Sequence, residues 1–167
     1  MESSPGHSRI AGTADAEEVA ALLDRFQLEF DSFTPGAAAL VQRVRRHITQ
    51  HLSVFLLAAP AEVGVAQLRF REYMITGETV CTLEELYVVP ERRGEGHGRT
   101  LVQSAFSVAR EQGATVIELT TAENDAAARG LYRSLGFTNL EKPGRPETRM
   151  LYYERELSPK SPASART

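Results

Sequence analysis

Apolar residues recur at helical spacing in four stretches of the chain. Within each stretch they lie three or four positions apart, which places them on one face of an α-helix and leaves the other face polar. We therefore predict helices over residues 15–30, 35–49, 98–112 and 126–135. The apolar faces of the first and third helices are Val19, Leu22, Leu23, Phe26 and Phe30, and Leu101, Val102, Ala105, Phe106 and Ala109.

Short apolar or alternating segments predict strands between and after these helices. They lie at residues 8–12, 53–59, 63–73, 79–89, 115–120, 137–140 and 148–155. Three of them follow one another, separated by turns at Pro60-Ala61-Glu62 and Thr76-Gly77-Glu78, and predict an antiparallel meander. The last two predict a hairpin around Pro143-Gly144-Arg145-Pro146. The order β-α-α-β-β-β-α-β-α-β-β predicts an α/β (α+β layered) domain with a mixed sheet and helices on its faces.

Helix boundaries follow from local residue types. Asp15 and Glu18 have the spacing of a capping box at the start of the first helix. Thr34 is predicted to cap the second helix, with Pro35 in its first turn. Gly113 and Gly136 are predicted to end the third and fourth helices, and either Asn124 or Asp125 is predicted to cap the fourth.

Composition narrows the class of protein. The 167 residues suit one domain, which we place at residues 1–157. Residues 1–8 predict a loose N-terminus, and residues 158–167, which hold no apolar residue beyond alanine, predict a disordered tail.

The net charge of −3 does not favour binding to nucleic acid or to an anionic membrane. The longest apolar run, residues 54–59, is too short to span a bilayer. Because the N-terminus also lacks an apolar signal region, we expect a cytoplasmic protein. Cys81 is the only cysteine, so no intrachain disulfide forms, and we expect it to be buried rather than nucleophilic.

Residues 79–99 form a predicted strand, a loop rich in arginine and glycine, and the start of a helix. Glycines at 94, 96 and 98 let the backbone approach a ligand, and the helix start adds partial positive charge, which together favour an anion site. The loop lacks the third glycine of a dinucleotide fingerprint and the Gly-Lys-Ser/Thr of a Walker loop. An ordinary glycine-rich turn with exposed arginines is the alternative.

Two motifs resemble the GCN5-related N-acetyltransferase (GNAT) superfamily. Arg93-x-x-Gly96-x-Gly98, directly after the strand that ends at Pro90, resembles its acetyl-CoA pyrophosphate loop. Ala128-x-x-Leu131-Tyr132-x-x-x-Gly136-Phe137 resembles its second conserved block. The resemblance extends over residues 10–157. It departs from the pattern where the family has an asparagine seven residues before the tyrosine, because Asp125 stands there and Asn124 one position earlier.

The resemblance implies a mostly antiparallel sheet whose fourth and fifth strands splay apart, and acetyl-CoA as cosubstrate, without a metal. Backbone N–H groups near the splay would bind the pantetheine and the thioester oxygen, and by position they belong to Leu86, Tyr87 and Val88. The loop would hold the pyrophosphate through its backbone amides. Its residues are Arg93, Gly94, Glu95, Gly96, His97, Gly98 and Arg99, and the pantetheine contact of the family asparagine would fall to Asn124 or Asp125.

Tyr132 is the candidate general acid. A tyrosine of pKa about 10 and a thiol of pKa about 8.5 are close enough for proton transfer to the leaving thiolate. The alternative is a core tyrosine on an apolar helix face, and the matching Leu131 and Gly136-Phe137 favour the catalytic role.

Glu84 and Glu85 are the candidates on the amine side. Side chains alternate along a strand, so we expect them on opposite faces. Family precedent places a substrate-binding or basic carboxylate at Glu84, and either glutamate would attract a cationic amine. A glutamate near pKa 4.3 and an alkylammonium near 10.4 differ by about 6 units, so an unperturbed glutamate is a poor direct base. The alternative for both is a solvated strand carboxylate.

The segment between the first two helices usually forms one wall of the acceptor site in this superfamily. Asp31 would bind an ammonium group there and Phe33 would line the pocket; a simple turn between helices is the alternative. His47 and His51 have no visible third ligand, so we expect no metal site.

These features predict an N-acetyltransferase that moves an acetyl group from acetyl-CoA to a primary amine of a small cationic molecule, of polyamine or aminosugar type, in a ternary complex. The alternatives are a protein or peptide amine as acceptor, or a non-catalytic acyl-CoA-binding module of the same fold. Whether the chain forms a homodimer is left open.

Overall fold

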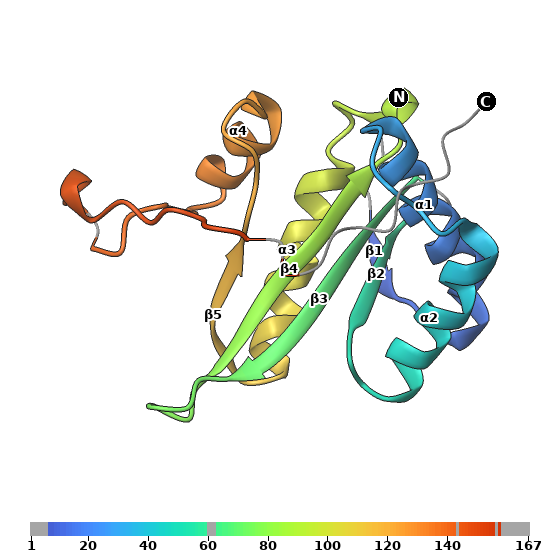
Figure 1. Cartoon of the computed structure of the whole chain (residues 1–167), viewed down its shortest axis with the longest axis horizontal. Coiled ribbons are helices and arrows are strands. Elements are labelled where there is room, and N and C mark those ends of the chain that lie inside the picture. Colours follow the sequence, from blue (N-terminus) through green and yellow to red (C-terminus); the bar gives the residue numbers. More distant parts are fainter. Residues whose placement is uncertain (1–6, 60–62, 143, 156, 158–167) are drawn as a thin grey trace. The chain divides into compact units, whose positions relative to one another are not determined.

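The computed structural model describes residues 7–59, 63–142, 144–155 and 157 (Figure 1). Its backbone falls into two compact units, one ending at Leu119 and the other beginning at Thr120. The turn at residues 60–62, position 143 of the last hairpin, most of the loose N-terminus and the tail at 158–167 lie outside the described residues. The prediction of one domain stays a prediction.

The first unit contains a five-stranded sheet. Its strands are β1 (Ser8–Ile10), β2 (Val54–Ala58), β3 (Gly64–Glu72), β4 (Thr79–Val88) and β5 (Ala114–Leu119). They lie side by side in chain order, antiparallel from β1 to β4, while β5 pairs with β4 in parallel (Figure 1). The predicted mixed, mostly antiparallel sheet is therefore confirmed, with the meander formed by β2, β3 and β4.

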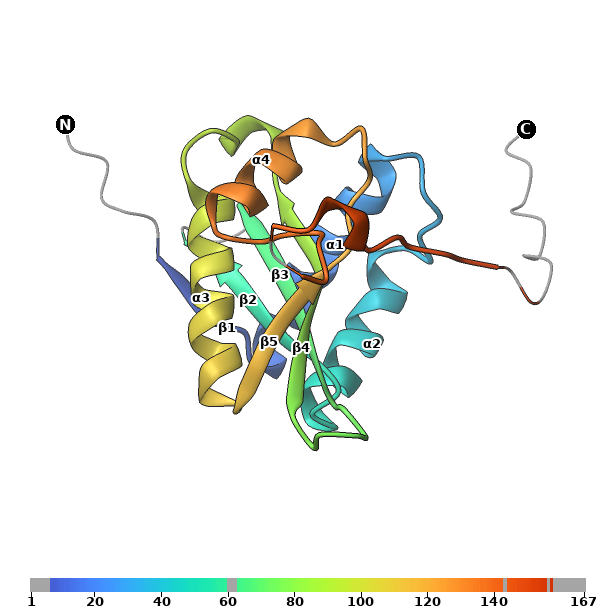
Figure 2. The same cartoon turned by 90° about the vertical axis from the view of Figure 1, so that its left-hand side faces the viewer.

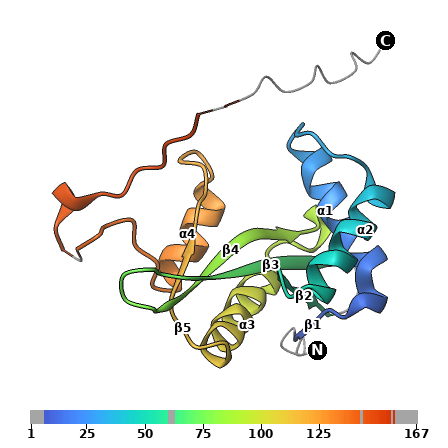
Figure 3. The same cartoon turned by 60° about the horizontal axis from the view of Figure 1, so that its bottom comes forward.

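Helices cover both faces of this sheet, as Figure 3 shows. One face carries α1 (Ala16–Glu29) and α2 (Ala37–Thr49), and the other carries α3 (His97–Glu111). The apolar stripes are buried: Val19, Leu22 and Leu23 of α1 and Leu101 and Val102 of α3 are at most 8% exposed. Phe26 and Phe106 are partly exposed, and Phe30 lies beyond the end of α1 with its side chain 57% exposed.

The core also accounts for the single cysteine. Cys81 is fully buried within β4, as predicted. Burial raises the pKa of its thiol to about 11, so the nucleophilic thiolate is scarce at neutral pH. Among the described residues, no helix is long and apolar enough to cross a membrane.

The two predicted N-terminal helix caps differ in outcome. Asp15 holds the N-cap position of α1 as predicted, but its carboxylate accepts no hydrogen bond from the helix. It turns back to the N–H of Gly12 at 2.8 Å and pairs with Arg9 at 2.7 Å, because a short 3₁₀ turn precedes the helix. Thr34 does not cap α2, since α2 begins after Gly36. Thr34 accepts from the Gly36 N–H and donates to Asp24 of α1, which joins the two helices.

The second unit is built on α4 (Ala126–Ser134). The side chain of Asp125 caps α4 by accepting from the Ala128 N–H at 2.9 Å, and Gly136 ends it with a positive φ of 88°. The predicted final hairpin is present only as one antiparallel bridge between Leu140 and Arg149. A 3₁₀ turn at Pro146–Thr148 lies where the second strand was predicted to begin, and no regular strand follows in the described part of this unit.

Candidate active site

The defining feature of the site is that β4 extends beyond the point where its pairing with β5 ends. The two parallel strands lie side by side (Figure 2), but their pairing ends at Leu83 and Leu119. On its other edge β4 continues to pair with β3 as far as Val88. Within the described residues, no strand pairs with the β5-side edge of β4 between Glu84 and Val88. This region therefore has backbone groups available for a ligand.

The direction of these backbone groups follows from the ladder. The N–H of Val89 donates to the carbonyl of Val63 next to β3. Because backbone groups alternate along a strand, the N–H of Tyr87 also points toward β3, while those of Leu86 and Val88 point to the other side. The carbonyl of Val88 points to that side too, where it accepts a hydrogen bond from Arg93 Nε at 2.9 Å. Of the three predicted N–H donors, Leu86 and Val88 thus face the open edge.

Glu84 and Glu85 lie on the same face of the sheet, so the prediction of opposite faces is wrong. Gln67 pairs with Glu85, whereas the next residue of β3, Leu68, pairs with Leu83. Glu84 is thus the extra residue of a β-bulge, which interrupts the alternation of side chains. Gln67 directly opposes Glu85 and also donates to Glu84 at 2.9 Å. Both carboxylates therefore share the face of the sheet that α1 and α2 cover.

The two glutamates have different surroundings. Glu84 is held by Gln67 and by an ion pair of 3.2 Å with Arg69, and Gln67 also donates to Ser53 Oγ, which contacts His47 Nδ1. Glu84 also lines a pocket of about 190 Å³, together with Arg69, Phe70, Arg71 and Thr82.

Glu85 is half-buried and makes no hydrogen bond or ion pair with any described residue. Its burial, followed by repulsion from Glu84, raises the pKa of Glu85 above its ordinary value. A raised pKa makes this carboxylate the stronger base of the pair.

The glycine loop joins β4 to α3. A 3₁₀ turn at Pro90–Arg92 comes first, and Gly94 and Gly96 then take φ values of 82° and 90° that side chains rarely adopt. A Cβ at either glycine would meet no atom within 4 Å, so the loop leaves open space beside its backbone. Gly96 precedes α3, whose first-turn N–H groups have no partner within the helix. The loop therefore has the conformation of an anion-binding site.

Several side chains of the loop are bound to other residues of the protein. His97 is 6% exposed, and its Nε2 contacts Glu95 at 3.2 Å. Glu95 is also bound by Arg92, and the hydrogen bond from Arg92 lowers the pKa of the Glu95 carboxyl. Arg93 reaches back to α1, where it pairs with Glu29 at 2.7 Å. The backbone of this loop, rather than the side chains of Arg92 and Arg93, is thus left to meet an anion.

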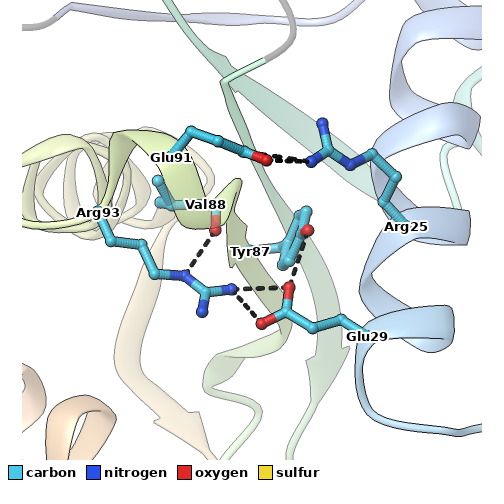
Figure 4. Close-up of polar contacts among 6 residues, drawn as sticks. All are labelled: Arg25, Glu29, Tyr87, Val88, Glu91 and Arg93. Atoms are coloured by element: carbon cyan, nitrogen blue, oxygen red, sulfur yellow. Dashed lines mark hydrogen bonds and ion pairs between the residues drawn. The ribbon is translucent and has the colours of Figure 1, made fainter.

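Glu29 is a residue that the sequence analysis missed. It lies in the last turn of α1 and binds both Arg93 and the hydroxyl of Tyr87 (Figure 4). Its sequence context carries no signal, because a carboxylate near a helix end is common on protein surfaces. The partners lie 58 and 64 positions away, so only the folded chain brings them together.

The two predicted acceptor-side residues lie just after α1. Asp31 has a φ of 50° and its N–H donates to the carbonyl of Leu28, which is the geometry of a helix C-terminus. Its side chain is exposed, and Phe33 is 75% exposed. Their positions agree with an open substrate wall and equally with a turn between helices.

The remaining predicted residues belong to the second unit. Asp125 is engaged as the helix cap, and Asn124 precedes it without taking that role. Tyr132 packs edge-on against Phe137, with ring centroids 5.6 Å apart. Burial, followed by the nearby charge of Asp125, raises the pKa of Tyr132 to about 12. The tyrosine is therefore fully protonated at neutral pH, as a proton donor must be.

Comparison with known proteins identifies this arrangement. Residues 20–137 match the model of the acetyltransferase (GNAT) family. The chain belongs to this family. It is 31% identical to the uncharacterized N-acetyltransferase YhfO of Bacillus subtilis over 77% of this chain and 87% of that protein.

Two further relatives show how far the similarity extends. An aminoglycoside N(6')-acetyltransferase type 1 of Stenotrophomonas maltophilia is 31% identical, over 64% of this chain and 69% of its own length. The solved structure of an acetyltransferase candidate from Arthrobacter sp. FB24 superposes with a TM-score of 0.83 at 37% identity, covering 94% of this chain and 99% of that one.

GNAT proteins use acetyl-CoA and an amine acceptor, and this chain is an acetyl-CoA-dependent N-acetyltransferase. Its loop fits the pyrophosphate of that cosubstrate, because the positive φ angles of Gly94 and Gly96 expose backbone beside open space. The edge of β4 at Leu86 and Val88 fits the acyl end, since no described strand pairs with the N–H groups that it presents there.

The loop geometry predicts that Gly96→Ala weakens acetyl-CoA binding at least tenfold, measured by calorimetry, because a Cβ would occupy the space that the pyrophosphate needs. A residue with positive φ also costs about 1 kcal/mol of folding stability. Gly113→Ala is the matched control: it has a similar φ of 76° and open surroundings, but lies at the other end of α3. Equal losses of affinity in both variants would show that strain alone is responsible.

Proposed function

We propose that this enzyme acetylates a primary amine of a small cationic molecule, of polyamine or aminosugar type, by direct transfer from acetyl-CoA in a ternary complex. The observation that carries the proposal is the position of Glu84 and Glu85, on one face of the sheet where β4 loses its partner β5. Two carboxylates beside the open backbone edge favour an ammonium group at that point. Asp31 would add a further negative charge on the same acceptor side.

The contacts of the two glutamates favour different roles for them. Glu84 accepts from Gln67 and Arg69, so its oxygens already have partners. Glu85 has a raised pKa and no partner among the described residues, so it is the better proton acceptor. Glu84 would attract the ammonium and hold the pKa of Glu85 up by repulsion. The pKa of Glu85 is closer to that of an alkylammonium than an ordinary glutamate's is, but it stays lower. The amine would therefore lose its proton to Glu85 while its nitrogen attacks the thioester.

The electrophile would be activated by the backbone of β4. The N–H groups of Leu86 and Val88 face the open edge, where they would donate to the thioester oxygen as it gains negative charge. One oriented donor of this kind is worth about 3 kcal/mol in other acyl-transfer sites. The glycine loop would fix the cosubstrate through its pyrophosphate, so that this oxygen meets those donors.

Tyr132 is proposed as the proton donor to the leaving sulfur. Its pKa of about 12 lies well above the thiol value of about 8.5, so complete transfer would be uphill by about 5 kcal/mol. Tyr132 would therefore act mainly by donating a hydrogen bond as the carbon–sulfur bond breaks, with the proton following later. Asn124 and Asp125 are proposed near the pantetheine, Asp125 only as an acceptor.

The substrate class is tested by a panel of amines with acetyl-CoA, followed by release of the free CoA thiol. We expect the highest kcat/KM for polyamines such as spermidine or for aminoglycosides such as kanamycin. Amino acids and peptides with free N-termini or lysines are the comparison set. Faster turnover of the peptides would assign a protein amine as acceptor and contradict the proposal.

The roles of the glutamates are tested by the pH dependence of kcat/KM. Activity should rise with pH through the raised pKa of Glu85, because the base acts when deprotonated. Glu84→Gln removes the neighbouring charge, lowers the pKa of Glu85 and so should move this rise to lower pH. Glu85→Gln should remove the rise and reduce kcat/KM about 100-fold. If Glu84→Gln, rather than Glu85→Gln, removes the rise of kcat/KM with pH, Glu84 is the base.

Tyr132→Phe should lower kcat about 10- to 100-fold and leave the Kd of acetyl-CoA unchanged, because only the proton donor is lost. Tyr153→Phe, an exposed tyrosine of the same unit, is the control and should keep full activity. Since an acid of pKa about 12 stays protonated until very alkaline pH, Tyr132 should cause no loss of activity below about pH 11. Unchanged turnover in Tyr132→Phe would remove it from the mechanism.

A further inference from the structure

We propose that Glu29 is a positioning residue for acetyl transfer, which holds the open end of β4 and the glycine loop against α1. It does so through two side chains, Tyr87 and Arg93. The proposal rests on the proposed function, because it assigns the open end of β4 to the thioester. It adds a residue to which neither of the two sequence motifs points.

The contacts converge on one carboxylate (Figure 4). Arg93 Nη2 lies 2.7 Å from one oxygen of Glu29 and donates to the other at 2.9 Å. The hydroxyl of Tyr87 donates to that second oxygen at 3.0 Å. Glu29 therefore joins a residue of β4 to a residue of the loop, and both to α1.

Each partner is itself fixed close to the reacting region. Tyr87 lies between Leu86 and Val88, the residues whose N–H groups face the open edge. Its side chain is 3% exposed and stacks on Phe26 of α1, with centroids 5.2 Å apart. Motion of Tyr87 would move both N–H groups, so holding its ring holds them.

Arg93 acts on the backbone directly. Its Nε donates to the carbonyl of Val88 at 2.9 Å, and its guanidinium lies 5.8 Å from the centre of the Tyr87 ring. That carbonyl is on the edge of β4 where β5 no longer supplies a partner. Arg93 thus replaces a missing strand contact, and Glu29 holds Arg93 in the orientation that allows it.

The same carboxylate connects the two halves of the proposed site. Glu29 ends α1, and the acceptor-side residues Asp31 and Phe33 follow directly. Arg93 opens the loop proposed for the pyrophosphate. If an amine moved α1, the contact between Glu29 and Arg93 would therefore move the loop as well. A ligand that moved the loop would move α1 through the same contact.

A second link between α1 and the loop provides the control. Arg25 pairs with Glu91 at 3.2 Å, with side chains 50% and 67% exposed. Within the described part of the chain, neither side chain of this pair forms a hydrogen bond with Tyr87 or with the backbone of β4, and exposed ion pairs contribute little. Glu91→Gln should therefore remove a bond between the same two elements without loosening the end of β4.

The first experiment uses acetyl-CoA and spermidine as probes. Glu29→Gln, which keeps shape and removes charge, should lower kcat about tenfold while the KM for acetyl-CoA changes less than threefold. Glu91→Gln should stay within twofold of the wild type in both. Glu29→Gln should cause a smaller loss when it is added to Arg93→Gln than when it is made in the wild type, because only the contact with Tyr87 then remains to be weakened. Additive losses, or unchanged kcat in Glu29→Gln, would overturn the proposal.

A second experiment needs no acceptor amine. The amide of Val89, which bonds to the Val63 carbonyl at 2.9 Å, reports how firmly the end of β4 is held. Its hydrogen exchange should be at least tenfold faster in Glu29→Gln, while the amide of Ala11, bonded to Phe55, should keep its rate. Equal acceleration at both amides would indicate general destabilisation and contradict positioning.

The two experiments separate the possible failures. If the wild type acetylates no amine of the panel, the proposed function fails, while the exchange rate of Val89 still decides whether Glu29 holds β4. If the wild type is active and Val89 exchanges at the same rate in Glu29→Gln, the positioning role fails and the proposed function stands.

Discussion

The structure depends on one constraint of backbone hydrogen bonding. β4 is paired on both edges up to Leu83, and beyond it, among the residues that the structure describes, only with β3. Backbone N–H and C=O groups left inside a protein without partners are costly, so each such group must find one. Arg93 satisfies the carbonyl of Val88. The N–H groups of Leu86 and Val88 face the edge that no described strand covers, and they are the donors proposed for the thioester oxygen.

The bulge at Glu84 brings together the two glutamates that are proposed to face the amine. Without it, neighbouring glutamates would point to opposite faces, and only one would meet the acceptor. With it, two carboxylates share a face. Arg69 and Gln67 bind Glu84, whereas Glu85 is half-buried, and burial, followed by the charge of Glu84, raises the pKa of Glu85. One extra residue in one strand thus produces two carboxylates with different properties.

The helix α1 has a larger role than covering the sheet. Its apolar face packs into the core, while its last turn places Glu29 at the point where β4 and the loop meet. Arg93, at the start of the predicted pyrophosphate loop, pairs with Glu29 of this helix. The anion site therefore relies on backbone amides and the start of α3, which are fixed in direction by glycine geometry and need no ordering of long side chains.

The sequence by itself determined the features that depend on neighbouring residues. Apolar spacing located the helices, glycines at 94, 96 and 136 marked positive φ angles, and two motifs identified the family. The relation of Glu84 to Glu85 depended on the register of β3, which local alternation cannot reveal. The role of Glu29 could not be predicted from the sequence, because its partners are 58 and 64 positions away. Only tertiary structure decided these points, since a register shift and a long-range ion pair exist only when distant segments pack together.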